Sequence, residues 1–145
     1  MRFLLLATAL VVAVSLASMC SAAAPEPLAM TNAAIGGGAL NQYTPGVEGG
    51  IGVNNIGLLI KTWGKVTFVD ATNKFFYIDD GYGRLDGSTH KGIRCSYDNL
   101  ASGVTITPPA ENAYVSVIGV ISTVMISSKV QPNIRPRRGD DIVTQ

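Results

Sequence analysis

The feature that most constrains the fold of this chain is a succession of short β-branched and aromatic segments in its second half. Val, Ile, Thr, Phe and Tyr fill these segments, and Gly, Pro, Asn and Asp separate them, which is the pattern of β-strands joined by turns. The alternation of side chains is most regular from residue 113 to residue 123. We therefore predict a small all-β domain with strands at residues 58–70, 75–79, 91–97 and 113–123, and a fifth strand between residues 124 and 137.

The segments between these strands also limit the fold. Residues 98–112 contain Gly103 and Pro108-Pro109, so we expect no more than one helical turn there. Gly64 interrupts the first strand and predicts a bulge or a sharp coil at that point. Residues 140–143 are a candidate for a further strand that would close a barrel.

The N-terminus has the three-part pattern of a secretory signal peptide. One basic residue precedes an apolar run that ends near Met19, and small residues follow before Pro25. We expect a signal peptide at residues 1–23, cleaved after Ala22 or Ala23, and a protein that is secreted or held in the cell envelope. The apolar run is marginal for a membrane span, which needs roughly 20 residues, so the alternative is a retained N-terminal anchor.

Cys20 raises a second alternative, a lipid anchor. Lipoprotein processing requires a small residue directly before the cysteine, and Met19 occupies that place, so this anchoring is disfavoured. Ordinary cleavage removes Cys20 and leaves Cys95 without a partner for an intramolecular disulfide. Cys95 is then expected to be a small buried hydrophobic residue, and no stable transmembrane helix would remain.

The charge balance argues against a general affinity for phosphate backbones. The whole chain has 11 basic and 10 acidic residues, and cleavage of the signal removes Arg2, which leaves equal numbers. A formally neutral domain lacks the broad positive field that drives non-specific binding to nucleic acids. A local basic patch is still compatible with this balance.

Residues 24–55 are rich in Gly, Pro and small side chains and show neither a helical nor a strand period. We expect a linker or an extended arm. Its apolar residues are too many for a purely solvated linker, so part of it is expected to lie against the domain at residues 56–145.

Three runs of the domain resemble OB-fold nucleic-acid-binding domains of the tRNA-anticodon type. They are Ile60-Lys-Thr-Trp-Gly-Lys-Val66, Phe76-Tyr-Ile-Asp-Asp-Gly-Tyr-Gly83 and Val115-Ser-Val-Ile-Gly-Val120. The run from Asn54 to Val66 and the C-terminal Ile134-Arg-Pro-Arg-Arg138 are similar to those of uncharacterised exported bacterial proteins. The resemblance covers about residues 35–143. It implies a five-stranded Greek-key barrel with an extended N-terminal arm, and it implies no catalytic residue.

Strand alternation predicts which side chains face the interior and which face outward. If Ile60, Val66, Phe76, Ile78, Ile93 and Cys95 point inward, a second set points outward from the first three strands. In OB-folds this outer face is the usual ligand platform. The predicted ligand-binding residues are therefore Lys61, Trp63, Lys65, Phe75, Tyr77 and Arg94.

This predicted face suits two kinds of ligand. Aromatic rings beside cationic side chains can stack the bases of single-stranded nucleic acids and offset phosphate charge. The same rings can stack on the apolar faces of sugars. The alternative is that the N-terminal arm covers the face, so that Trp63 and Phe75 are core residues. A shift of phase at Gly64 would change the direction of Trp63 and would leave that of Tyr77 unchanged.

The remaining polar residues form no recognisable catalytic or metal-binding motif. Asp79, Asp80 and Asp86 lie close together in sequence, but their spacing is not that of an EF-hand loop. His90 is the only histidine and has no catalytic partner in the sequence, and Cys95 with His90 cannot complete a zinc site. We therefore expect no enzyme and no cofactor.

Two functions follow from these observations. The first is an exported, non-enzymatic binding module for an oligonucleotide or a glycan on the outer face of the first three strands. The second is a structural or protein-interaction module of the cell envelope, in which the arm occupies that face.

Overall fold

The computed structural model describes residues 25–145, so the expected signal peptide and Cys20 lie outside the described residues. The regular secondary structure of the described chain is β-strand apart from two short 3-10 turns. No helix in residues 25–145 has the length and apolar character needed to cross a membrane. The elements are β1 (Leu28–Ala29), η1 (Asn32–Ala34), β2 (Leu59–Asp70), β3 (Phe75–Asp79), β4 (Ile93–Ser96), β5 (Tyr114–Ile126), β6 (Lys129–Arg135), η2 (Gly139–Asp141) and β7 (Ile142–Thr144).

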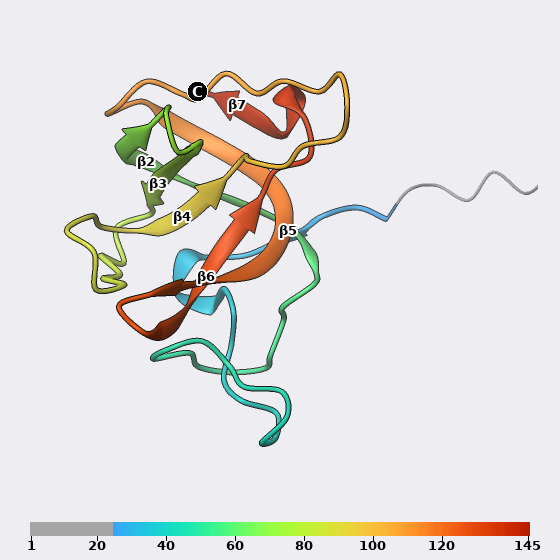
Figure 1. Ribbon diagram of the computed structural model, residues 1–145, viewed down its shortest axis with the longest axis vertical. Helices are drawn as coiled ribbons and strands as arrows, with labels where there is room; N and C mark the ends of the chain where they lie inside the picture. The colour runs from blue at the N-terminus through green and yellow to red at the C-terminus, as the bar shows by residue number, and fades with distance from the viewer. Residues whose placement is uncertain (1–24) are drawn as a thin grey trace, which may run out of the picture.

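The strands form one seven-stranded mixed sheet, and five of them make a ring (Figure 1). Around the ring the order is β2, β3, β4, β6 and β5, and β5 pairs again with β2. All of these contacts are antiparallel except β4 with β6, which is parallel. The all-β prediction and the five strands are thus confirmed, although the third strand is shorter than predicted and the fourth is longer.

The interior of the ring is filled by alternate residues of each strand, as a period of two requires. Val115, Val117 and Ile121 of β5 and Ile134 of β6 are at most 1% exposed and join one apolar cluster. The residues predicted to point inward all belong to this cluster and are fully buried: Ile60, Val66, Phe76, Ile78, Ile93 and Cys95.

The irregularity in β2 lies three residues beyond the predicted place. β2 pairs with β5 from Leu59 to Lys65 in regular register, and the shift occurs against β3, between Val66 and Phe68. Gly64 is needed for a different reason: a Cβ atom there would lie 2.7 Å from the backbone carbonyl carbon of Asp79. β2 pairs with β5 up to Lys65 and with β3 from Lys65 onward. The glycine at position 64 lets the backbones of β2 and β3 approach each other just before the pairing with β3 begins.

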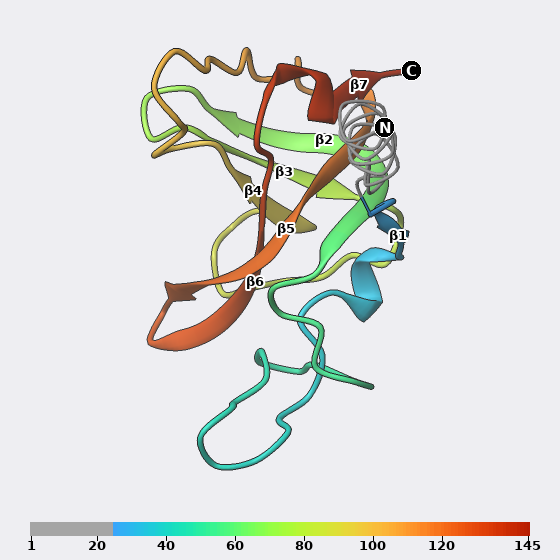
Figure 2. The same cartoon turned by 90° about the vertical axis from the view of Figure 1, so that its right-hand side faces the viewer.

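The N-terminal arm closes one end of the ring. β1 runs parallel to β2, and η1 follows it below the sheet (Figure 2). Ile35 is fully buried in the core cluster, so the expectation that part of the arm lies against the domain is confirmed. The prediction that this segment lacks regular structure was wrong for β1 and η1. Their stability comes from contacts with β2 and β3, which local periodicity does not report.

The rest of the arm forms a loop that projects beside the β5–β6 hairpin (Figures 1 and 2). The backbone N–H of Glu48 donates a 2.8 Å hydrogen bond to Val130 O and fixes the loop to β6. Leu40 and Tyr43 at its far end are largely exposed.

The C-terminal strand does not close the ring. β7 pairs only with Val115–Val117 of β5 and lies outside the five-strand circuit, which the β2–β5 pairing closes. A strand does form near the expected residues 140–143, at Ile142–Thr144, but the expectation that it closes the ring was wrong. β5 has 13 residues: its first half pairs with β2 and, at Val115–Val117, also with β7, and its second half pairs with β6.

Candidate functional site

The six predicted ligand-binding residues do not form one continuous exposed platform. Lys61, Trp63 and Lys65 lie in the first half of β2, where it pairs with β5. The other three, Phe75, Tyr77 and Arg94, lie on β3 and β4. The loop at residues 80–92 covers the outer side of the sheet at Tyr77, within the second group.

The first group forms an open surface that we call the tryptophan face: Lys61, Trp63, Lys65 and Tyr114. Trp63 is 48% exposed and Tyr114 is 62% exposed. Lys65 lies opposite Tyr114 in the β2–β5 register, and Trp63 lies opposite Ser116 on the same pair of strands. Two hollows of about 370 Å³ each are lined by both aromatic side chains, and one includes Lys61 while the other includes Lys65.

Tyr114 was not predicted as a site residue. It begins the fourth strand, some 50 residues after Trp63, and only the β2–β5 pairing brings the two rings to one surface. Its outward position in the alternation of the fourth strand was the one available signal, because the first and fourth strands are adjacent in an OB-fold.

The charges around the tryptophan face are mixed. One hollow is lined by Lys65 together with Asp79 and Asp80 from the end of β3. The carboxylate of Asp79 accepts the backbone N–H of Gly83 at 2.8 Å. The carboxylate of Asp80 accepts the backbone N–H of Asn32 at 2.8 Å, so the arm helps to position this acidic edge.

The second group includes a cation–π pair. The guanidinium carbon of Arg94 lies 3.7 Å from the ring centroid of Phe75. Its Nε donates a 3.1 Å hydrogen bond to the hydroxyl of Ser96. Within residues 25–145, the Nη atoms of Arg94 donate no hydrogen bond to another residue.

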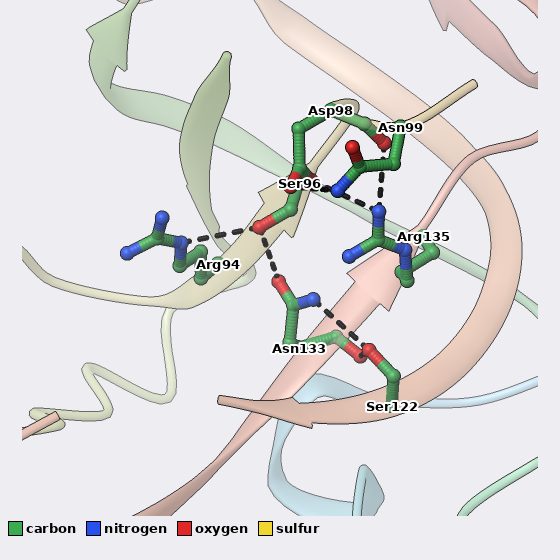
Figure 3. Close-up of polar contacts among 7 residues, drawn as sticks. All are labelled: Arg94, Ser96, Asp98, Asn99, Ser122, Asn133 and Arg135. Atoms are coloured by element: carbon green, nitrogen blue, oxygen red, sulfur yellow. Dashed lines mark hydrogen bonds and ion pairs between the residues drawn. The ribbon is translucent and has the colours of Figure 1, made fainter. Parts of the chain in front are cut away.

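A row of polar side chains continues from Arg94 across β6 to β5 (Figure 3). The Ser96 hydroxyl donates to Asn133 Oδ1 at 2.9 Å, and Asn133 Nδ2 donates to the Ser122 hydroxyl at 2.9 Å. Ser96 and Asn133 are only 5% and 2% exposed. The row therefore stabilises the β4–β6–β5 seam and holds Arg94, and it presents few free groups to a ligand.

Tyr77 is on the predicted outer side, but it is not accessible. It is 1% exposed because the 80–92 loop folds over it, and its hydroxyl donates a 2.7 Å hydrogen bond to Asp86 Oδ2. Burial, together with this hydrogen bond to Asp86, raises the pKa of Tyr77 to about 12. The expectation of an exposed Tyr77 was wrong, because alternation gives the side of a sheet and does not give what covers that side.

His90 and Phe68 complete this covered region. Their rings stack with centroids 3.6 Å apart and planes 12° from parallel. The Thr67 hydroxyl also donates to Lys91 O at 2.6 Å, which fastens the end of the loop to β2. Phe68 was not predicted as a site residue, because the shift between Val66 and Phe68 brings its side chain to the outer side.

The arm does not cover the tryptophan face. Asn32 of η1 contacts the inner side of the sheet, where it accepts a 2.9 Å hydrogen bond from the buried hydroxyl of Thr62 and donates to Ile78 O. The alternative in which the arm turns Trp63 into a core residue was therefore wrong for the described part of the arm. Phe75 is half-buried, and its neighbours are Arg94, Phe68 and Tyr77.

The acidic residues of the 80–92 loop and its flanks have separate structural partners. Asp86 is 4% exposed and accepts from Tyr77 and from the Ser88 backbone N–H. Within residues 25–145, no group of three His, Cys, Asp or Glu side chains is placed to hold a metal ion. Cys95 is fully buried, and burial raises the pKa of its thiol.

Searches for a matching protein family, a matching curated protein and a matching solved structure found none. The resemblance to OB-fold domains therefore stays a prediction. The structure itself supports an all-β sheet with a ring of five strands.

Proposed function

We propose that the ring is an OB-fold barrel and that the protein is an exported, non-enzymatic module that binds an oligosaccharide on its tryptophan face. The strand order supports the fold. Numbered along the chain, the five ring strands pair in the order first, second, third, fifth and fourth, and the third and fifth are parallel. OB-folds are five-stranded Greek-key barrels that bind oligonucleotides and oligosaccharides.

The observation that carries the function is the exposure of Trp63 beside Tyr114. Trp63 is the only tryptophan of the chain, and an indole left 48% exposed forgoes about half of the free energy that its full burial would supply. Two neighbouring aromatic rings, with a hollow on each side, offer flat apolar surfaces of the size of a sugar ring.

The charges favour a glycan over a nucleic acid as the ligand. Lys61 and Lys65 are offset by Asp79 and Asp80 at the edge of the same surface. Carboxylates repel phosphates, whereas they accept hydrogen bonds from sugar hydroxyls. A face with both signs of charge therefore suits a neutral ligand with many hydroxyl groups.

A single-stranded nucleic acid is the second candidate, and the pair of Phe75 with Arg94 favours it. The guanidinium covers a half-buried ring and keeps its Nη atoms free of described partners, an arrangement that suits a stacked base beside a phosphate. A structural module of the cell envelope is the remaining alternative, and it predicts no small ligand at all.

The test is a titration followed by the fluorescence of Trp63. The probes are chitohexaose, cellohexaose and a ten-nucleotide oligo-dT, each at low and high salt. We expect a shift in Trp63 emission with an oligosaccharide that does not depend on salt. A shift with oligo-dT alone that weakens steeply with salt would support the nucleic-acid alternative instead. No response to any probe would contradict binding on this face.

Variants locate the binding surface. Trp63→Ala and Tyr114→Ala should each weaken oligosaccharide binding by about tenfold or more in calorimetry, because each variant removes the apolar ring surface that the sugar would cover. Tyr43→Ala is the matched control, because Tyr43 is 83% exposed on the arm loop. Equal loss in all three variants would mean that the tryptophan face is not the site.

Export is tested separately through the N-terminus. Mass spectrometry of the protein recovered outside the cytoplasm should give a chain that begins at Ala23 or Ala24. A chain that retains residues 1–23 would contradict cleavage.

A further inference from the structure

The two hollows of the tryptophan face differ in the charge of their walls. Asp79, Asp80 and Lys65 line one hollow together with both aromatic rings. The other hollow has Lys61 on its wall, and its lining residues within 25–145 include no acidic side chain. Lys65 lies opposite Asp79 in the β2–β3 register, yet within residues 25–145 it forms no ion pair with either carboxylate. The first hollow therefore carries one more negative charge than positive.

The turn that follows β3 fixes the direction of the Asp79 carboxylate. Its Oδ1 accepts the backbone N–H of Gly83 at 2.8 Å and that of Gly81 at 3.3 Å. Both glycines have positive φ, 101° at Gly81 and 73° at Gly83, so the chain folds back around this oxygen. The carboxylate is therefore held in one orientation on the wall of the hollow.

The second oxygen of Asp79 has no such partner. Its Oδ2 accepts no hydrogen bond within residues 25–145, and it is not one of the buried polar atoms that lack a partner there, so it is accessible in the hollow. In Asp80, by contrast, Oδ1 accepts the backbone N–H of Tyr82 at 3.1 Å and Oδ2 accepts that of Asn32 at 2.8 Å. Asp79 therefore offers the hollow an accessible and oriented acceptor beside the two rings.

We propose that Asp79 determines which glycans bind to the tryptophan face. A sugar unit that covers Trp63 turns its edge hydroxyl groups toward the wall of the hollow, and one of them donates to Asp79 Oδ2. A charged acceptor makes this a stronger hydrogen bond than a neutral one would. The same charge repels an acidic sugar, so the ligand class is a neutral oligosaccharide without uronic acids. This inference rests on the proposed function and adds the residue that makes it selective.

The variant Asp79→Asn changes the group that the ligand meets and keeps the group that the turn needs. The asparagine Oδ1 can still accept from Gly81 and Gly83, because asparagine shapes the same kind of turn. In place of Oδ2, the amide nitrogen substitutes a neutral donor for a charged acceptor. Asp140→Asn is the matched control, since Asp140 is exposed and lines neither hollow.

Calorimetry compares the neutral cellohexaose and chitohexaose with the hexamer of cellouronic acid, which has the cellohexaose backbone and a carboxylate in place of each primary alcohol. The wild type should bind a neutral sugar more tightly than the acidic one. In Asp79→Asn the affinity for the neutral sugar should fall about fivefold, and the affinity for the acidic sugar should rise about threefold. The ratio of the two affinities should stay at its wild-type value in Asp140→Asn.

The outcomes separate this inference from the proposed function. If Asp79→Asn leaves the ratio of neutral to acidic affinity unchanged, whether both affinities fall or neither does, Asp79 has no part in selection and the inference is overturned while the glycan function stands. Equal binding of neutral and acidic sugars by the wild type overturns it in the same way, without the use of a variant. If the wild type binds none of the three sugars, the proposed function fails and the inference falls with it.

Discussion

The hydroxyl of Tyr77 donates a 2.7 Å hydrogen bond to Asp86 Oδ2, and both residues are nearly inaccessible to solvent. This bond joins the sheet to the loop that follows it. Asp86 also accepts the backbone N–H of Ser88, so a single carboxylate both shapes the loop and fastens it to β3. The loop in turn decides which part of the outer side is open to a ligand.

The first prediction concerns this contact. Tyr77→Phe keeps the ring but leaves the buried Asp86 carboxylate without its hydroxyl donor, so the free energy of unfolding should fall by about 1–3 kcal/mol. Chemical denaturation measures this change. Hydrogen exchange at residues 83–91 should also become faster, because the loop loses its anchor. A variant with unchanged stability and exchange would show that the bond does not hold the loop.

The same residue predicts a loss of stability at alkaline pH. The pKa of Tyr77 is raised from 10.0 to about 12 in the folded protein by burial and by Asp86. Because the folded pKa is the higher one, this stabilisation is fully present below pH 10 and is lost as the pH rises towards 12. The difference in stability between the wild type and Tyr77→Phe should therefore shrink over this interval. A constant difference would contradict the assigned pKa.

Asp141 predicts the opposite dependence at acid pH. Its side chain is 2% exposed, and it accepts hydrogen bonds from the backbone N–H, Nε and Nη2 of Arg137 at 2.8–3.0 Å. Burial alone would raise its pKa, but the hydrogen bonds and charges of Arg137, with Arg138, lower it below 3.8. This stabilisation is present above pH 3.8 and is lost as the pH falls through the lowered pKa.

Asp141→Asn should accordingly destabilise the protein by about 1.5–3 kcal/mol at pH 7, the range for hydrogen bonds to charged groups. The difference from the wild type should decrease below pH 3.8. Asp140→Asn is the matched control, since Asp140 is exposed and forms no ion pair with a residue between 25 and 145. An equal effect of the two variants would contradict the role given to Asp141.

Gly64 is predicted to tolerate no side chain. A Cβ atom at this position would lie 2.7–2.9 Å from three backbone atoms of Asp79, so Gly64→Ala must push β2 and β3 apart. We expect a loss of about 1–3 kcal/mol in the free energy of unfolding. Gly139→Ala is the control, because its nearest neighbour would be 3.7 Å away. A harmless Gly64→Ala would show that the strands can separate at little cost.

Cys95 is predicted to be unreactive in the folded protein. It lies at the centre of β4 with no exposed surface, and burial raises the pKa of its thiol. In a Cys20→Ser variant, Ellman's reagent at pH 8 should react with Cys95 only after unfolding. Rapid reaction under native conditions would contradict the placement of β4.

Much of the ring was predictable from local pattern. Because β-strands alternate with a period of two, the sequence alone indicated that Ile60, Phe76, Ile78 and Cys95 share the interior. The bounds of the strand from Phe75 to Asp79 were also correct, since turn residues at 71–74 and 80–83 stand on either side of the run Phe75-Phe76-Tyr77-Ile78.

The candidate site was predictable only in part. Lys61, Trp63 and Lys65 were placed on one side of one strand by alternation alone, and the structure keeps them there. Tyr114 joins them through the pairing of β2 with β5, which no local signal reports. The side of Phe68 depends on the shift after Val66, which was expected at Gly64 instead.

The sequence by itself determined which side of β2 (up to Val66), β3 and β4 faces the core, because that choice follows from the alternation of side chains within a few positions. Only the tertiary structure decided which outward residues meet solvent. Tyr77 and Trp63 are both outward, yet the 80–92 loop covers the first and leaves the second open. The loop is held over the sheet by a hydrogen bond between Asp86 and Tyr77 and by the stacking of His90 on Phe68. These contacts depend on the path of the 80–92 loop in three dimensions, which the alternation within a strand does not determine.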